Sequence, residues 1–179
     1  QALRQMISPT AAIFTTLGAA HSAGFESLTH KATEKWQLLT AVGKQYLHAD
    51  TVVPHLPQGV LSQPQVRSFG KLPNCTLHIQ HVQKQATTTT ITARYQNALR
   101  QITIRFTDDA SINNACCCWL FLLDYGLNDA TIAARMLQLT PVNMRLQLTV
   151  GVHQSYLIND SYSNDVSSLT IALDYLQQQ

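Results

Sequence analysis

The alternation of apolar and polar residues along the chain predicts a mixed α/β fold. Residues 11–16 form a short apolar run, which is typical of a buried strand. A stripe of apolar residues at helical spacing follows the potential N-cap Ser27, so we expect a helix over residues 28–41. This stripe consists of Leu28, Ala32, Trp36 and Leu39.

The middle of the chain predicts turns and then antiparallel strands. Residues 51–73 contain four prolines and two glycines, which break any long element and leave short strands and turns. Three segments rich in Thr, Ile and Val follow, with turn-like gaps at Lys84-Gln85 and Gln96-Asn97, so we expect two hairpins. The three segments are residues 75–82, 87–95 and 99–106.

A helical hairpin is predicted next. Asp109 or Ser111 is a suitable cap for a strongly apolar helix that stops at Gly126. Asn128 caps a second helix, which ends before Pro141.

A new unit starts after this hairpin. Residues 145–150 and 155–158 look like strands, and a helix capped by Asn164 or Asp165 follows them. Because a strand-turn-helix unit restarts here, we expect two domains. Their predicted ranges are residues 1–142 and 143–179.

Composition narrows the class of protein. The chain has 179 residues, 45% of them hydrophobic, which is typical of a packed globular protein. Its formal charge of +2 is small and scattered, so we expect no nucleic-acid partner. The longest apolar run, residues 115–123, is too short to span a membrane, and no signal segment opens the chain. We therefore expect a soluble cytoplasmic protein without a membrane partner.

The cysteines point to the same compartment. Cys75 and the consecutive cysteines at 116–118 form a poor disulfide framework. Three adjacent thiols on a helix diverge and cannot close one zinc site, so we expect them to be packing residues.

The first candidate for chemistry is the pair His21 and Lys35. His21 follows the first predicted strand through a turn of small residues, and Lys35 lies fourteen residues later on the predicted helix. At about 100° per residue, Lys35 falls within about 20° of Leu28 and so inside the apolar stripe. A buried lysine is favoured as a neutral amine, which can take up carbon dioxide and become an anionic carbamate. The alternatives are an ordinary turn histidine and a lysine that reaches water.

Two further groups of polar residues adjoin predicted helices. The amide of Asn113 or Asn114 can read the edge of an adenine, or these residues are simply polar helix-start positions. Asp160 lies between a predicted strand and a helix, where it can face a ligand or be an ordinary loop residue.

Taken together, these residues resemble those of the Mur ligases, the ATP-dependent amide-bond ligases of peptidoglycan synthesis. The segment around His21 is similar to T-N-x-G-x-A-H-x-x-G-F-x-S-L, and its spacing to Lys35 matches that of the carbamylated lysine of the family. Asn114-Ala115 resembles the N-A-L-A-A helix. Residues 141–145 resemble the interdomain segment P-V-x-G-R, and residues 160–164 resemble D-S-Y-N-A-N.

The resemblance implies a fold and a reaction. The fold is part of a P-loop-type central ligase domain with an antiparallel β segment, followed by the start of a Rossmann-like carboxyl-terminal domain. The G-F-x-S-L and D-S-Y-N-A-N motifs favour the enzyme that adds D-alanyl-D-alanine to UDP-N-acetylmuramoyl tripeptide through an acyl phosphate. Residues 4–10 and 106–112 are most similar to the form fused to an alanine racemase.

The resemblance also implies roles for individual residues. His21 and a carbamylated Lys35 would hold Mg²⁺ at the catalytic centre. Asn114 would contact the adenine of ATP, and residues of the hinge and of the carboxyl-terminal domain would close over the nucleotide. The implied nucleotide contacts are Asn114, Arg145, Asp160, Ser161 and Asn164.

The chain also departs from the family pattern. Thr16 replaces an Asn, Ala110 and Ser111 replace His-Asn, and Met144 replaces a Gly. The chain begins without Met, and residues 1–179 contain neither the glycine-rich phosphate loop nor the acidic metal ligand of the family. We therefore expect a piece of a ligase that is inactive alone and that self-associates through exposed sheet edges. The other readings are a folate-polyglutamate type of ligase and a non-catalytic nucleotide-binding module.

Overall fold

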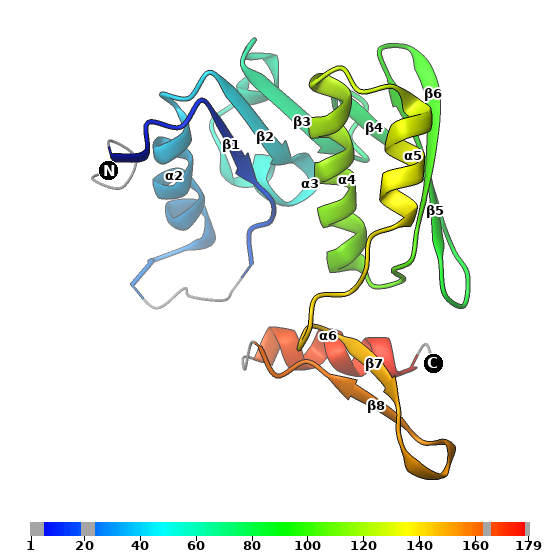
Figure 1. The fold of residues 1–179 in the computed structure, drawn as a ribbon. Coiled ribbons are helices and arrows are strands. Elements are labelled where there is room, and N and C mark those ends of the chain that lie inside the picture. Colours follow the sequence, from blue (N-terminus) through cyan, green and yellow to red (C-terminus); the bar gives the residue numbers. More distant parts are fainter. Residues whose placement is uncertain (1–5, 19–23, 163–165, 178–179) are drawn as a thin grey trace.

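The computed structural model describes residues 6–18, 24–162 and 166–177, and it confirms a mixed α/β fold (Figure 1). A six-stranded sheet has the order β1-β2-β3-β4-β5-β6. Strands β1 to β4 are parallel, whereas β4, β5 and β6 pair antiparallel. The strands are β1 Ala11–Phe14, β2 Lys44–His48, β3 Val66–Gly70, β4 Leu77–Lys84, β5 Thr89–Tyr95 and β6 Ala98–Ile104.

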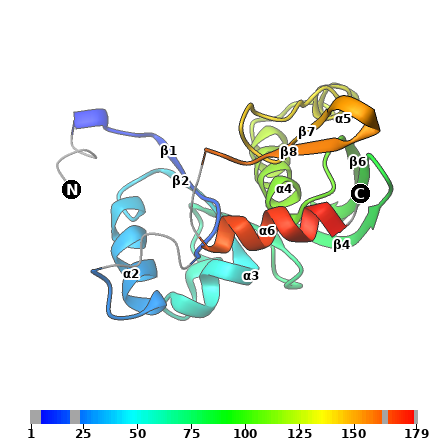
Figure 2. The ribbon, with the colours of Figure 1, turned by 90° about the horizontal axis from the view of Figure 1, so that it is seen from below.

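Helices cover both faces of this sheet, as Figures 1 and 2 show. Tyr46 of β2 belongs to the core shared with α4 and α5, whereas its neighbour Leu47 belongs to the core shared with α2. Successive strand residues point to opposite faces, so β2 is buried on both. The helices around the sheet are α2 Leu28–Leu39, α3 Ala49–Val52, α4 Asp109–Asp124 and α5 Asp129–Leu137.

Helix α2 begins as predicted and buries most of the predicted face, together with Lys31. The Ser27 hydroxyl accepts a hydrogen bond from the His30 backbone N–H at 3.0 Å, which confirms the N-cap. The buried residues of α2 are Lys31, Ala32 and Trp36, whereas Leu28 is exposed. The predicted stripe is therefore only partly right, because Leu28 in the first turn is not covered.

The helical hairpin and the two β-hairpins are confirmed. The cap of α4 is Asp108 rather than the predicted Asp109 or Ser111, and its carboxylate accepts from the Ser111 N–H at 2.7 Å. Asn128 caps α5 through Thr131, as expected. The turn between β5 and β6 holds two residues at positive φ in succession, a pairing typical of tight hairpin turns.

The segment before the hairpins differs from the prediction. Strand β2 was not predicted, although four of its five residues are buried. Residues 51–73 were expected to form short strands and turns. They contain one strand, β3, and helical turns that follow α3. These turns are η1 Val53–His55 and η2 Val60–Ser62.

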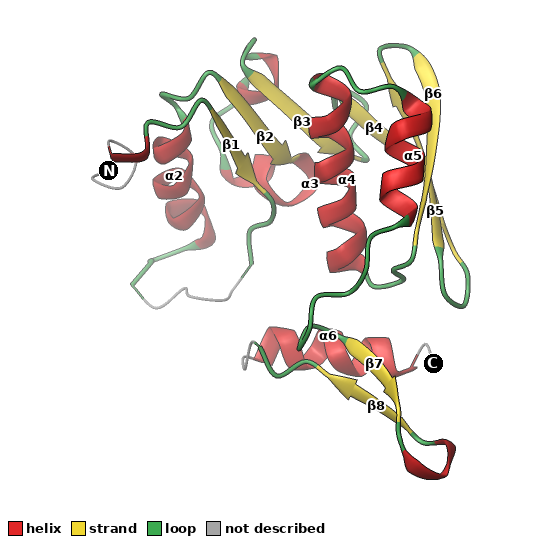
Figure 3. Cartoon of the chain, viewed as in Figure 1, coloured by secondary structure: helices red, strands yellow, loops and turns green. Residues whose placement is uncertain are grey.

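The end of the chain forms a small unit below the carboxyl edge of the parallel strands in Figure 1. Two strands pair antiparallel and are joined through η3 Val152–Gln154, and helix α6 follows them. Figure 3 shows these strands in yellow and the helix in red. Leu169 and Leu173 of α6 are exposed. The elements are β7 Gln147–Val150, β8 Tyr156–Asn159 and α6 Val166–Gln177. Among the described residues, no helix is both long and apolar enough to cross a membrane.

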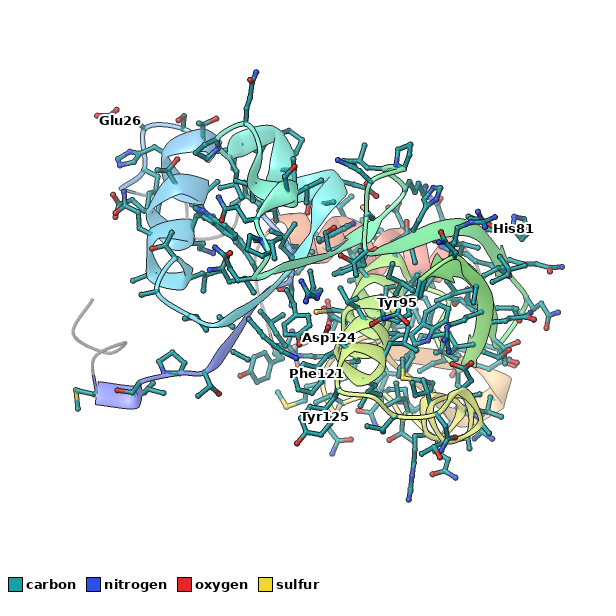
Figure 4. All side chains as sticks on the ribbon, turned by 90° about the horizontal axis from the view of Figure 1, so that it is seen from above. Glu26, His81, Tyr95, Phe121, Asp124 and Tyr125 are labelled. Carbon is teal, nitrogen blue, oxygen red and sulfur yellow. The ribbon has the colours of Figure 1, made fainter. Side chains whose placement is uncertain are left out.

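A mostly buried carboxylate joins the end of α4 to the opposite, amino edge of the sheet. Asp124 accepts hydrogen bonds from Lys44 Nζ at 2.8 Å, from the Tyr46 hydroxyl at 2.7 Å and from Arg67 Nε at 3.0 Å. Figure 4 labels Asp124 beside Phe121 in the last turns of the helix. Three donors converge on one carboxylate here, so α4 is fixed to both β2 and β3.

Candidate functional site

A cavity of about 360 Å³ lies between the first turns of α4, the linker that follows α5, and α6. We call it the linker cavity. Its walls are mainly apolar, with a few polar groups that come from different elements. The lining residues include Asp108, Asn114, Cys118, Val142, Arg145 and Tyr175.

The wall formed by α4 is fixed by hydrogen bonds. Asp108 is buried, and its carboxylate caps the helix. The Thr89 hydroxyl donates to the Phe106 carbonyl at 2.6 Å, which ties the segment before the helix to β5. Asn114 lies in the second turn of α4 and lines the cavity. Its amide thus presents a donor and an acceptor beside an apolar surface.

Arg145 forms part of the opposite wall. Its neighbours Met144 and Leu146 have φ values of 64° and 44°, which are unusual for residues other than Gly. The Arg145 guanidinium carbon lies 4.1 Å from the centre of the Tyr162 ring, within the range of a cation–π contact. The linker therefore turns sharply on both sides of Arg145 and holds this side chain near the cavity.

The other predicted nucleotide residues that the structure describes, Asp160 and Ser161, do not line the cavity. Asp160 accepts a hydrogen bond from the Leu146 N–H at 3.1 Å, so its carboxylate fixes the linker. Ser161 is exposed and donates to the side chain of Asn159. Asn164 lies outside the described residues. Of the four that the structure describes, Asn114 and Arg145 line the linker cavity, and Asp160 and Ser161 do not.

The predicted metal pair is not brought together in the described part of the chain. His21 lies outside the described residues, and Lys35 is exposed, with its Nζ 5.9 Å from the centre of the Phe14 ring. The fully buried lysine of α2 is Lys31, which is 2% exposed and donates to the Gly18 carbonyl at 2.7 Å. The exposed side chain agrees with the alternative of a lysine that reaches water, although Ala32 and Trp36 of the same apolar stripe are buried.

No set of three or more His, Cys, Asp or Glu side chains suited to a metal ion occurs within residues 6–18, 24–162 and 166–177. Since His21 falls outside these ranges and Lys35 alone is no site, the fit of Mg²⁺ to the pair is not demonstrated by the described geometry. Its role stays a prediction.

Cysteine packing is confirmed for most of the thiols. Cys75, Cys116 and Cys117 are buried, and burial raises the pKa of Cys116 and Cys117 to about 12. Cys118 differs because it is exposed and lines the linker cavity. The buried thiols are thus protonated packing groups at neutral pH.

A second cavity, of about 580 Å³, lies on the other side of α4, and we call it the carboxyl-edge cavity. Its charged and polar residues follow β2, β3 and β4 or begin α4. Sequence reasoning named Asn113 as a candidate for chemistry, Asp109 as a cap and Lys84 as a turn residue, and it named none of the others. The sequence His-Ala-Asp at 48–50 could have indicated this cavity only if residues 44–48 had been recognised as a strand. The polar lining residues are His48, Asp50, Lys71, Lys84, Asp109 and Asn113.

The two cavities lie on opposite faces of α4. Asp109, Ile112 and Asn113 face the carboxyl-edge cavity, whereas Ser111, Asn114 and Cys118 face the linker cavity. At about 100° per residue, the two sets are directed about 180° apart. One helix therefore separates an apolar site from a charged one.

Comparisons with known proteins identify relatives of this arrangement. The family model described as Mur ligase middle domain matches residues 1–122. No curated protein sequence matches the chain.

Among solved structures, the chain is similar to MurF from Acinetobacter baumannii, with a TM-score of 0.79 and 18% identity over 98% of this chain and 39% of that one. MurF from Thermotoga maritima in complex with ADP has a TM-score of 0.78 and 14% identity over 98% of this chain and 41% of that one. A mutant FPGS from L. casei has a TM-score of 0.66 and 12% identity over 95% and 42%. The chain thus spans about two fifths of the length of these structures.

Proposed function

This chain belongs to the Mur ligase family, and from that membership we propose that it carries the base-binding part of an ATP-dependent ligase. The ligase forms an amide bond in the synthesis of a peptidoglycan precursor. Membership in the family establishes the class of fold. The substrates and the reaction are part of the proposal.

One observation carries the proposal. Asn114 of α4 and Arg145 of the linker, which the sequence assigned to the nucleotide, line the same cavity. An apolar cavity with an amide on one wall suits a planar heterocycle whose edge both donates and accepts hydrogen bonds. Adenine has such an edge. The likeness to a MurF structure that contains ADP supports the same assignment.

We propose the following reaction for the complete enzyme. ATP phosphorylates the terminal carboxylate of UDP-N-acetylmuramoyl tripeptide, and ADP leaves. The amine of D-alanyl-D-alanine then attacks the acyl phosphate, which forms the amide and releases phosphate. Positioning and charge neutralisation dominate catalysis of this kind.

The residues of this chain have distinct parts in the proposal. Asn114 reads the adenine edge, and Arg145 approaches the nucleotide from the linker. Asp160, with Ser161 and Asn164, follows when the carboxyl-terminal unit closes, a movement that completes the site only with substrate bound. In the present arrangement, Asp160 holds Leu146 and so sets the position of the linker.

The proposal also covers the metal ion, the domain boundary, a fused domain and the location of the protein. We retain His21 and a carbamylated Lys35 as the residues that would hold Mg²⁺, which would neutralise phosphate charge when bound. We also retain residues 1–142 as the central domain and residues 143–179 as the start of the next. A fused alanine racemase and a cytoplasmic location complete the proposal.

A coupling assay tests the function. The full-length product of the reading frame that carries this sequence is incubated with ATP, UDP-N-acetylmuramoyl tripeptide and D-alanyl-D-alanine. We expect phosphate release and a product with the mass of the amide. Coupling of glutamate to a folate instead would show the folate-polyglutamate type of ligase, and nucleotide binding without any coupling would show a non-catalytic module.

A further inference from the structure

We propose that His78 and His81 form a binding site for a divalent transition-metal cation on the outer face of the antiparallel strands. Neither histidine lines the linker cavity or the carboxyl-edge cavity. The site also uses neither residue of the predicted Mg²⁺ pair. It is therefore independent of the proposed function.

A bulge in β4 brings the two histidines to one face of the sheet, although residues three apart on a regular strand point to opposite faces. His78 pairs with Arg94 of β5. After a shift in register, His81 pairs with Thr92. Arg94 and Thr92 are two residues apart and share a face, so their partners share it as well. Gln80 is the extra residue of the bulge, which redirects the side chain that follows it.

The burial of β4 supports this arrangement. Ile79 and Val82 both contact the core that α4 covers, although they too are three residues apart. His78 is half-buried and His81 is exposed. Figure 4 shows the labelled His81 on the outside of the molecule. The two imidazoles thus lie on the side of β4 that faces away from α4.

Both imidazoles are available to a ligand. Neither makes a hydrogen bond or an ion pair with a residue in the described ranges. A neutral imidazole has one unprotonated ring nitrogen, which can bind a metal ion. Neighbouring positions on one face of a strand lie about 7 Å apart, and two rings turned toward each other can span this separation with an ion between them. The pair can therefore bind one cation.

The nitrogen ligands select the class of cation. Imidazole suits zinc, copper and nickel, whereas Mg²⁺ prefers oxygen ligands. Two protein ligands are fewer than the four of a structural zinc site, so water completes the coordination on the solvent side. Affinity should be highest for Cu²⁺ and lower for Ni²⁺ and Zn²⁺. We expect no binding of Mg²⁺ at this site.

Arg94 reduces the affinity of the site. It lies opposite His78, and its positive charge repels a divalent cation. The Arg94 side chain is exposed and can extend into solvent, so water and salt screen this repulsion. Arg94→Gln should therefore strengthen metal binding, by roughly twofold to threefold.

Paramagnetic line broadening in the isotope-labelled 179-residue chain locates the bound ion. The Cys118→Ser variant is used throughout, because the exposed Cys118 thiol would bind and reduce Cu²⁺. A substoichiometric amount of Cu²⁺ should broaden the amide signals of His78, His81 and Thr92. The signals of His153, an exposed histidine of η3, should stay sharp.

Isothermal titration of Ni²⁺ tests whether both histidines bind the same ion. His78→Gln and His81→Gln should each weaken binding roughly tenfold or more, because the remaining imidazole loses a second ligand held at high effective concentration. His153→Gln is the matched control and should bind Ni²⁺ as the parent does. Both substitutions in β4 are on its outer face, so the remaining amide signals should keep their positions.

Three results would overturn the assignment. Broadening centred on another histidine would place the ion elsewhere. Unchanged Ni²⁺ affinity in both β4 variants would exclude the pair, and a loss confined to one variant would show a single ligand instead of two. Binding of Mg²⁺ with the same broadened or shifted signals would contradict the choice of a transition metal.

Discussion

At the scale of single residues, Asp124 shows how charge fixes the fold. Burial raises the pKa of this carboxyl, but hydrogen bonds from Lys44, Tyr46 and Arg67, together with the charge of Arg67, outweigh burial and lower the pKa to about 2. The Asp124 side chain is 10% exposed, so solvent screens these contacts only partly. The ionised carboxylate therefore stabilises the folded state.

Asp124→Asn should lower the free energy of unfolding by roughly 2 kcal/mol at pH 7. The folded pKa lies below the unfolded value near 4, so the contribution of Asp124 is complete above about pH 5 and is lost as pH falls toward 2. Urea unfolding at several pH values measures the difference between parent and variant. Asp129→Asn is the matched control, since the Asp129 side chain is 60% exposed and loss of its ion pair with Arg100 should cost under about 1 kcal/mol. An unchanged difference at pH 2.5 would contradict this role.

Asn114→Ala should weaken ADP binding roughly tenfold, because the variant loses a hydrogen bond to the base beside an apolar wall. Asn113→Ala is the control, since Asn113 faces the other cavity and should leave ADP affinity unchanged. Isothermal titration of ADP into the three proteins provides the measurement. Equal losses in the two variants would indicate general disturbance of α4 instead of a contact with the base.

At the scale of elements, local patterns predicted caps and hairpins but missed the buried strand β2. Ser27 and Asn128 each accept a hydrogen bond from a backbone N–H three residues later, so the local sequence is enough to predict these caps. Strand β2 has the sequence Lys-Gln-Tyr-Leu-His, which lacks a continuous apolar run. The Gln45 amide is nevertheless buried, because it donates to the Leu39 carbonyl at 2.7 Å. That partner comes from the end of α2, and its position was not readable from β2 itself.

The linker offers a test of backbone strain. Met144 replaces the glycine of the family pattern and has a φ of 64°, a conformation that costs a side-chain-bearing residue roughly 1–2 kcal/mol. Glycine relieves this cost but gains roughly 0.5–1 kcal/mol of unfolded-state entropy. Met144→Gly should therefore raise the free energy of unfolding by up to about 1 kcal/mol.

Val142→Gly is the control for that variant. Val142 is exposed and does not have a positive φ, so glycine there should lower the free energy of unfolding by up to about 1 kcal/mol. If the linker is strained, urea unfolding should give changes in the free energy of unfolding of opposite sign for the two variants. A loss of stability in both would contradict strain at Met144.

At the scale of the whole molecule, the family resemblance pointed to two residues that the fold brings to one cavity, whereas periodicity did not. Asn114 and Arg145 lie on separate elements, and no local pattern places them at one cavity. Lys35 shows the converse. Its helical angle indicated burial, but which face of α2 meets the sheet depends on contacts such as that of Lys31 with Gly18. Helical periodicity defines faces, and tertiary packing decides which of them is covered.

The exposed apolar residues of the carboxyl-terminal unit predict self-association of this chain. Val150, Val166 and Leu169 are all largely exposed, and β1 is an edge strand of the sheet. Multi-angle light scattering should show a mass that rises above the monomer value with concentration. Leu169→Gln should reduce this rise, and Leu99→Gln, at an exposed site on β6, should not. A constant monomer mass at high concentration would exclude self-association.

The central claim is that the linker cavity binds the base of an adenine nucleotide. A crystal structure of the 179-residue chain grown with ADP measures this most directly. We predict adenine between α4 and the linker, with its edge within hydrogen-bonding distance of the Asn114 amide. Adenine bound elsewhere, or an empty linker cavity in crystals that hold ADP at another site, would contradict the claim.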